Sequence, residues 1–170
     1  MKKLIVVLLF ILPFSGTSFA QKVNVTAYDS ALNQKVLVGN CNRQALTSGE
    51  FGNYFNPEYK EYKPSEKLIN ELRTKINNVS IVVVFGEWCG DSQEQVPRFI
   101  KIMDEAGMDS SNITLIAVNR AKEAVVEDIS MYNIERVPTF IVFKGDAEIG
   151  RIVETPYNSL EEDLWEILNK

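Results

Sequence analysis

The chain has 170 residues and is acidic, with 18 Lys and Arg against 23 Asp and Glu, a net charge of −5 and no histidine. The negative charge argues against binding to nucleic acid or anionic lipid. The lack of histidine excludes Ser-His-Asp and Cys-His catalysis and histidine-ligated metal sites. Two cysteines, Cys41 and Cys89, are too few for a four-cysteine metal site, so we expect no metal and no other cofactor.

The first 20 residues have the layout of a secretory signal peptide. Two lysines precede nine consecutive apolar residues, Leu4 to Leu12, and small residues lead up to Ala20, after which we expect cleavage. The apolar run is shorter than the ~20 residues of a membrane-spanning helix, which disfavours the alternative of an uncleaved anchor. We therefore expect a bacterial protein that is periplasmic or secreted, begins at Gln21 and has no stable membrane insertion after cleavage.

The region before residue 64 is polar and aromatic, and residues 21–63 are expected to form an N-terminal extension. Val36 to Val38 are predicted as a short strand. Glu50 to Tyr62 are predicted as a helix that is broken or kinked around Pro57. Aromatic residues recur in this helix every three or four positions, which indicates one face that packs on the main core: Phe51, Tyr54, Phe55, Tyr59 and Tyr62.

From residue 64 to residue 170 the apolar pattern is regular and predicts one α/β domain. Helices are expected from Ser65 to Asn77, from about Cys89 to Ala106 with a kink at Pro97, from Lys122 to Met131, and after the capping residue Ser159. Strands are expected at 81–85, 113–118, 139–143 and 148–153, the last two as a hairpin. This order predicts a mixed central sheet with helices on both faces, which several α/β folds share.

Two short motifs distinguish among these folds. Phe85-Gly86-Glu87-Trp88-Cys89-Gly90-Asp91-Ser92 follows a predicted strand and opens a predicted helix, and Val137-Pro138-Thr139 precedes another strand. Together they resemble the thioredoxin superfamily, in which a strand leads into Trp-Cys-Gly-x-Cys and a cis-proline loop faces the active cysteine. More closely, the chain is similar to a thioredoxin-like subfamily with a Trp-Cys-Gly-Asp-Ser turn and a helical N-terminal extension. The resemblance covers about residues 40–168 and implies a thioredoxin-like domain at 64–170.

The resemblance implies that Cys89 is the reactive residue. A cysteine at the first turn of a helix faces unpaired backbone N–H groups and the positive end of the helix dipole, which favour the thiolate. We expect Trp88 to shield the sulfur on one side. Pro138, cis as the resemblance implies, removes a backbone donor beside the sulfur and exposes the Val137 backbone for pairing with an extended substrate. The predicted substrate-binding residues are Trp88, Val137 and Arg136.

Two residues depart from the dithiol pattern of thioredoxins. Ser92 occupies the position of the second motif cysteine, and a hydroxyl neither ionises near neutral pH nor forms a disulfide. Val83 occupies the position at which thioredoxins carry a buried aspartate that assists that cysteine. Cys89 can therefore begin a thiol–disulfide exchange, but another thiol must complete it. The predicted catalytic set is Cys89, Trp88, Pro138 and Ser92.

The charges near Cys89 leave its reactivity open. Three carboxylates flank it in the sequence and oppose thiolate formation: Glu87, Asp91 and Glu94. Asp91 can equally serve the helix N-terminus. Arg136 lies two residues before Pro138 and is expected to offset the carboxylates. Arg120 follows a predicted strand and is interpreted as a solvated surface charge.

The second cysteine, Cys41, has two interpretations. It can be a displaced resolving thiol that forms a disulfide with Cys89, as an oxidising compartment would allow. Alternatively it is a small buried apolar residue beneath the N-terminal helix. We favour the second interpretation, because the sequence does not establish that the two residues approach within disulfide range.

Three functional classes fit these residues. The leading hypothesis is a monothiol thiol–disulfide oxidoreductase that forms mixed disulfides between Cys89 and protein or small-molecule thiols. The second is a binding module that holds exported proteins in a groove at Trp88 and Pro138 without turnover. The third is a glutathione-dependent iron–sulfur site like that of monothiol glutaredoxins, which Trp88 and the export signal disfavour.

Overall fold

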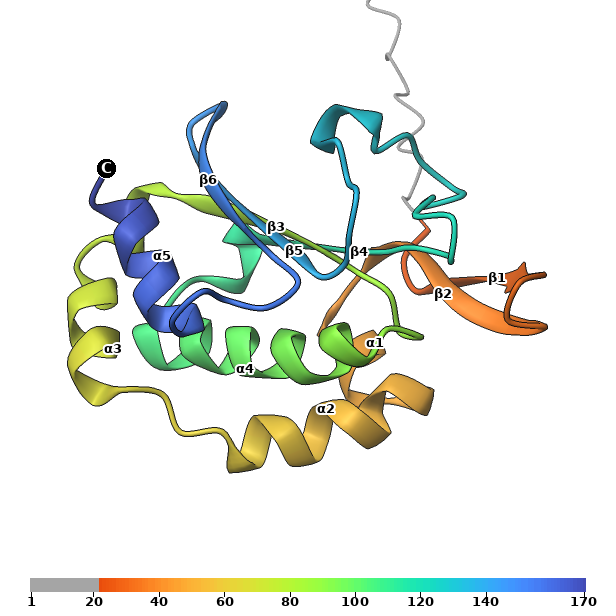
Figure 1. The fold of residues 1–170 in the computed structure, drawn as a ribbon, viewed down its shortest axis with the longest axis horizontal. Coiled ribbons are helices and arrows are strands. Elements are labelled where there is room, and N and C mark those ends of the chain that lie inside the picture. Colours follow the sequence, from red (N-terminus) through yellow and green to blue (C-terminus); the bar gives the residue numbers. More distant parts are fainter. Residues whose placement is uncertain (1–21) are drawn as a thin grey trace, which may run out of the picture.

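The computed structural model describes residues 22–170, and the predicted signal peptide, residues 1–20, lies outside them. Six strands form one sheet in the order β1-β2-β4-β3-β5-β6 (Figure 1). Their bounds are Val25–Asp29 (β1), Gln34–Cys41 (β2), Ser80–Phe85 (β3), Ile113–Ala117 (β4), Thr139–Lys144 (β5) and Ala147–Val153 (β6). β3 and β4 are parallel and the other neighbours are antiparallel, which confirms the predicted mixed sheet.

The α-helices lie on one side of this sheet and the 3-10 helix η3 lies on the other (Figure 1), which agrees with the predicted helices on both faces. The α-helices are Arg43–Thr47 (α1), Gly49–Glu61 (α2), Glu66–Arg73 (α3), Gly90–Ala106 (α4) and Leu160–Leu168 (α5). Three short 3-10 helices are Ile76–Asn78 (η1), Ser110–Asn112 (η2) and Ser130–Tyr132 (η3). Within residues 22–170, no helix has the length and apolar character needed to cross a membrane.

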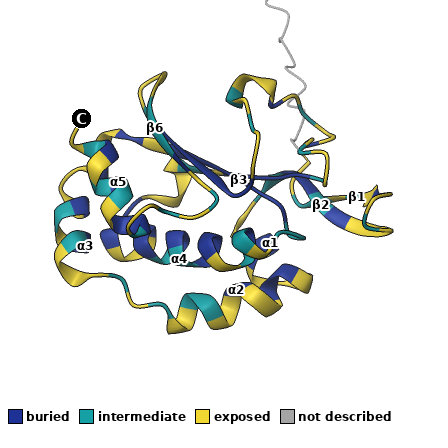
Figure 2. Cartoon of the chain, viewed as in Figure 1, coloured by how far each residue is buried: buried dark blue, intermediate teal, exposed yellow. Residues whose placement is uncertain are grey.

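The central strand β3 is buried on both faces, as its unbroken apolar run predicts. Ile81, Val83 and Phe85 pack in a cluster with the α-helices, on what we call the helical face. Val82 and Val84 pack on the opposite face with residues of the segment 119–138, and we call this the loop face. Figure 2 shows the buried strands between the two exposed outer layers.

Helix α4 follows β3 directly and connects the core to the motif. Cys89 is its N-cap residue, and Gly107 ends it in the left-handed conformation, with φ 80°. Pro97 lies within the helix. The buried side of α4 includes Phe99, which stacks on Phe140 of β5 with ring centroids 4.3 Å apart. This packing determines where the first turn of α4, and therefore the motif, sits relative to the sheet.

The N-terminal region contains more structure than the sequence indicates. β1 and β2 form a hairpin in which Val25 pairs with Val38 and Asp29 with Gln34, whereas only Val36 to Val38 were expected as strand. Helix α2 runs through Pro57 without the predicted break. Pro57 lies on the exposed side of α2, where the carbonyl left without a helical partner can bind water.

The predicted helix from Lys122 to Met131 is wrong. Within the described chain, residues 119–138 form an irregular loop whose one helical element is the 3-10 turn η3. Lys122 and Val125 adopt left-handed φ angles of 66° and 65°, which an α-helix excludes. The Asn119 side chain accepts a hydrogen bond from the Glu123 backbone N–H at 2.9 Å, so turn chemistry competes with helix formation. The loop face is therefore covered by η3 and by irregular chain.

Candidate functional site

The two predicted motifs meet at one edge of the sheet. Cys89 ends the turn between β3 and α4, and its Sγ donates a hydrogen bond to the backbone carbonyl of Val137 at 3.2 Å. The Val137–Pro138 peptide bond is cis. Cys89 is half-buried, so the sulfur is in contact with the proline loop while one side remains accessible. Residues 48 positions apart in the sequence thus form one site.

Trp88 lies beside the thiol and is held by the neighbouring strand. Its Nε1 donates to the carbonyl of Val118, directly after β4, at 2.9 Å. Gly86 makes room for the ring, because a Cβ at that position would lie 2.6 Å from Trp88 Cε2. The glycine of the motif is therefore required by the close approach of the indole.

Ser92, at the position of the missing second cysteine, is fully buried. Its Oγ accepts a hydrogen bond from the Gly86 backbone N–H at 3.2 Å. The Gln93 side chain makes a second hydrogen bond within the turn, from its Nε2 to the Glu87 carbonyl at 2.8 Å. In this structure Ser92 therefore acts as a support of the turn. Val83 is fully buried in the helical-face cluster.

Two of the three carboxylates that flank Cys89 in the sequence are engaged elsewhere. Glu87 Oε2 accepts a hydrogen bond from the Leu37 backbone N–H in β2 at 3.1 Å. Burial raises the pKa of Glu87, and the hydrogen bond from Leu37 opposes this rise. Glu94 pairs with Arg98 one turn along α4, at 2.7 Å. Only Asp91 remains as an acidic residue of the first turn of α4.

Arg136, expected to offset the carboxylates around Cys89, is itself paired. Its guanidinium bonds to Glu154 at 2.8 Å, and this contact raises the pKa of Arg136. The Glu154 backbone N–H in turn donates to the Pro138 carbonyl at 2.7 Å. The pair therefore braces the proline loop and carries little net charge.

Arg120 is exposed, as the interpretation of a solvated charge predicts, and it also contacts the site. Its guanidinium carbon lies 4.6 Å from the centroid of the Trp88 ring, in a cation–π contact. Its backbone N–H donates to Asp29 Oδ2 at 2.7 Å. A signal for this residue was present: Arg120 follows β4, and residues that follow two neighbouring parallel strands meet at the same edge of a sheet.

Cys41 and Cys89 are both free thiols and pack on different faces of the sheet. Cys41 lies against the helical-face cluster, whereas Cys89 lies against the loop-face cluster. Burial raises the pKa of Cys41 to about 12, so its thiolate is disfavoured. Cys41 is partly buried, and its position on the other face of the sheet disfavours the interpretation of a resolving thiol for Cys89.

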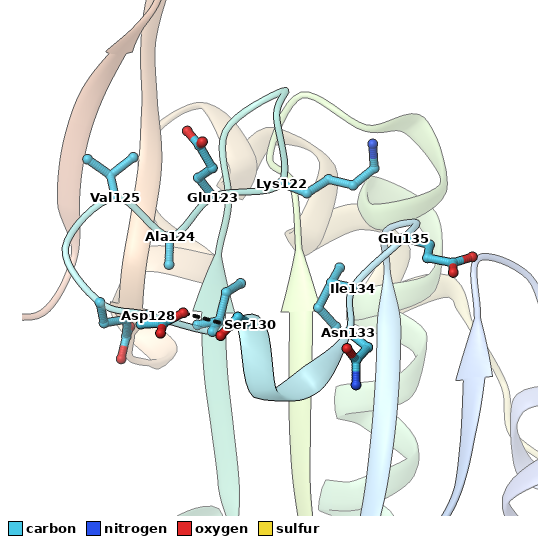
Figure 3. A pocket seen from close by; sticks show the side chains of 11 residues that line it. Lys122, Glu123, Ala124, Val125, Asp128, Ser130, Asn133, Ile134 and Glu135 are labelled. Carbon is cyan, nitrogen blue, oxygen red and sulfur yellow. Dashed lines mark hydrogen bonds between the residues drawn. The ribbon is translucent and has the colours of Figure 1, made fainter.

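A pocket of about 380 Å³ opens over the sulfur, and we call it the thiol pocket. It is lined by Trp88, Cys89, Arg120, Lys122, Glu135, Arg136, Val137 and Glu154. A larger hollow of about 720 Å³ adjoins it within the loop and shares Lys122 and Glu135 with it. Figure 3 shows this second hollow, with Ala124 and Ile134 pointing into it from opposite sides of the loop. The irregular loop thus builds most of the surface around the thiol.

Comparisons with known proteins agree with this geometry. Residues 50–163 match a family model described as thioredoxin. A thioredoxin-like protein of Acanthamoeba polyphaga mimivirus is 24% identical over 102 residues, which are 58% of this chain and 72% of the viral protein. The matched range of the family model includes Cys89 and the Val137–Pro138 loop and begins after the β1–β2 hairpin.

Solved structures with a similar fold share little sequence with this chain. A protein of unknown function from Pseudomonas aeruginosa is 17% identical, covering 71% of this chain and 81% of its own, with a TM-score of 0.47. The reduced thioredoxin pre-protein of Schistosoma mansoni is 22% identical, covering 64% and 92%, with a TM-score of 0.38.

Proposed function

Because the chain belongs to the thioredoxin family, we propose that it is an exported monothiol protein that carries out thiol–disulfide exchange at Cys89. The family supports a thioredoxin-type redox function in general. The monothiol mechanism and the export are the parts that we propose. The observation that supports the monothiol mechanism best is the accessible Cys89 sulfur, 3.2 Å from the Val137 carbonyl, with a buried serine in place of a second thiol.

The proposed reaction begins with loss of the Cys89 proton to solvent. The thiolate attacks one sulfur of a substrate disulfide, the bond between Cys89 Sγ and that sulfur forms, and the substrate S–S bond breaks. The other substrate sulfur leaves with the electron pair as a thiolate. A second thiolate from outside the chain then attacks the mixed disulfide, forms a new disulfide with the substrate sulfur, and releases Cys89 as a thiolate.

The need for an outside thiol rests on two contacts. The Ser92 hydroxyl is already bonded to the Gly86 backbone and cannot displace a sulfur. Cys41 lies against the other face of the sheet, and its raised pKa leaves little thiolate near neutral pH. Within residues 22–170, neither side chain is suited to release a substrate that is bound to Cys89.

The shape of the site is consistent with an extended polypeptide as substrate. The thiol pocket is bounded by Trp88 on one side and by the Val137–Pro138 loop on the other. Backbone beside a cis proline can pair with an extended chain in thioredoxin-type sites, and this role is what the resemblance implies for Val137.

The exchange reaction is tested with the reduced protein and a peptide disulfide, followed by mass spectrometry of the acid-quenched mixture. We expect one peptide to attach at Cys89 and to remain attached until a thiol such as glutathione is added. Cys89→Ser should lose the adduct, and the matched variant Cys41→Ser should keep it. Peptide binding without any adduct would favour the binding-module alternative.

Export is proposed from the predicted signal peptide alone. Expression of the full chain in a bacterium with separate cytoplasmic and periplasmic fractions tests it. We expect mature protein outside the cytoplasm with Gln21 as its first residue. Intact N-terminal methionine in the cytoplasmic fraction would contradict the proposal.

A further inference from the structure

The thiol pocket contains two positive side chains, Arg120 and Lys122, that form no ion pair with another described residue. Within the described chain, the ion pairs at up to 4 Å do not include Arg120 or Lys122. Arg136, the third base of the pocket, is paired with Glu154. Glu135 is the remaining acid of the pocket lining. The pocket lining therefore has three bases and two acids, a net charge of +1, on a chain whose net charge is −5.

Arg120 is held at the pocket from two directions. Its guanidinium lies over the Trp88 ring. Trp88 precedes Cys89 in the sequence and lines the thiol pocket with it. The Arg120 backbone N–H is bonded to Asp29. Asp29 is buried and its carboxylate also accepts hydrogen bonds from the backbone N–H groups of Ala31 at 2.8 Å and Leu32 at 3.2 Å. Arg120 is thus a fixed feature of the pocket wall.

The side-chain donors of Arg120 and Lys122 are available to a ligand. Neither side chain donates a hydrogen bond to another described residue, since the bond formed by Arg120 comes from its backbone. A guanidinium presents five N–H donors in one plane and pairs with a carboxylate through two of them. Two such cations beside a reacting sulfur attract a substrate that carries negative charge there.

We propose that Arg120 and Lys122 make the thiol pocket selective for disulfides with a carboxylate close to the reacting sulfur, and that Asp29 positions Arg120 for this task. The proposal rests on the exchange at Cys89 proposed above. The carboxylate can belong to an acidic residue of a polypeptide or to a small molecule such as glutathione. The β1–β2 hairpin then takes part in substrate selection, although it precedes the range that the thioredoxin family model matches.

Paired probes separate charge from the chemistry of the disulfide. The first pair is a disulfide-linked dimer of a one-cysteine peptide with Glu next to the cysteine, and the same dimer with Gln. The second pair is oxidised glutathione and its tetraethyl ester, in which all four carboxylates are esterified. The rate of adduct formation at Cys89 is measured for each probe at low salt, and the ratio within each pair cancels changes in the reactivity of the thiol.

For the wild-type protein we expect the Glu peptide to react about five- to tenfold faster than the Gln peptide, with the difference shrinking as salt is added. The double variant Arg120→Met with Lys122→Met should bring the ratio close to one. Lys144→Met is the matched control, because Lys144 is exposed and ends β5, at the opposite end from the proline loop. It should leave the ratio unchanged.

The positioning role of Asp29 is tested by the same ratio. Asp29→Ala should lower the Glu-to-Gln rate ratio about two- to fivefold, because Arg120 is retained but its backbone is no longer held. The rate for the Gln peptide should stay within about twofold of wild type. Loss of both rates together would indicate a general structural role and overturn this part. Circular dichroism confirms that the variant is folded.

The outcomes distinguish this inference from the proposed function. If no probe attaches to Cys89, the exchange function itself is wrong. If all probes attach but the ratios are near one in the wild-type protein, the function stands and the selectivity is refuted. Selectivity within the peptide pair alone identifies a polypeptide as the source of the carboxylate, and selectivity within the glutathione pair alone identifies a small molecule.

Discussion

On the helical face of the sheet, five α-helices bury a large apolar cluster that includes Phe51, Phe85, Phe99 and Phe140. On the loop face, the irregular segment 119–138 covers a smaller cluster around Val84 and Ile116. Cys89 sits at the edge where these two faces meet. The first face resembles the interior of any stable α/β domain, whereas the second supplies the walls of the thiol pocket. Stability and chemistry are thus divided between the two sides of one sheet.

The difference follows from what each covering element can provide. A regular helix satisfies its own backbone and presents a continuous apolar stripe. An irregular loop can turn charged side chains and backbone toward a pocket, as Arg120, Lys122 and Val137 do at the thiol pocket. Replacing the expected helix at 122–131 by a loop is therefore consistent with a specialised binding surface.

The largest expected effect tests the division of stability between the faces. Phe99→Ala removes a fully buried ring from the helical face and should lower the free energy of unfolding by about 3–5 kcal/mol. Ile129→Ala, on the loop face, should cost about 2 kcal/mol, because the loop can close over the smaller residue. Urea denaturation measures both. Equal losses would contradict the proposed division.

Ser92 offers a second test, at the boundary between the faces. Ser92→Ala leaves the Gly86 N–H without its partner and should cost about 1–3 kcal/mol in the free energy of unfolding. Ser92→Cys restores a second thiol three residues after Cys89. We expect this variant to release bound peptide without an added thiol, which mass spectrometry detects as loss of the adduct and gain of an internal disulfide. A persistent adduct in Ser92→Cys would argue against Ser92 as the missing resolving position.

The fit of Trp88 against Gly86 gives a smaller effect that concerns activity more than stability. Gly86→Ala places a Cβ 2.6 Å from the indole, so the ring must move and lose its bond to Val118. We expect adduct formation at Cys89 to slow about tenfold, in line with the cost of a small misplacement at a site. Gly90→Ala is the control, because a Cβ there meets nothing within 4 Å. Similar slowing in both variants would show that the Trp88 contact is not the cause.

The smallest expected effect is the pH dependence of the stability that Asp29 of the β1–β2 hairpin contributes. The Asp29 carboxylate accepts hydrogen bonds from the backbone N–H groups of Arg120, Ala31 and Leu32, and these bonds hold its pKa below the usual value of 3.8. A carboxyl with a lowered pKa stabilises the fold above its unfolded-state value, and this contribution is lost as the pH falls through the lower folded-state value. The stability difference between wild type and Asp29→Asn should therefore be constant near neutral pH and shrink below pH 3.8. Denaturation curves over this pH range measure it, and a difference that grows in acid would be the wrong sign.

Much of the domain could be predicted because its signals are local. The apolar run at β3 and the glycine that ends α4 both depend on neighbouring residues, and both elements lie where they were expected. The β1 strand was missed, although its side chains alternate between buried or partly buried and exposed, because its one buried residue is the polar Asp29. The helix at 122–131 was wrong, because its composition suits a helix while the Asn119 cap and the left-handed residues favour a turn.

The sequence by itself predicted Cys89 as the reactive residue, since Trp-Cys-Gly follows a buried strand and opens a helix. It also determined that the usual second thiol is absent, at Ser92. Only the tertiary structure showed which charged side chains lie near the sulfur and which of them are paired. Glu87 binds the Leu37 backbone and Glu94 pairs with Arg98. Arg136 pairs with Glu154, and the Arg120 guanidinium lies over the Trp88 ring. The physical reason is that charge acts through distance in space, and those distances depend on how β1, β2 and the loop pack against the motif.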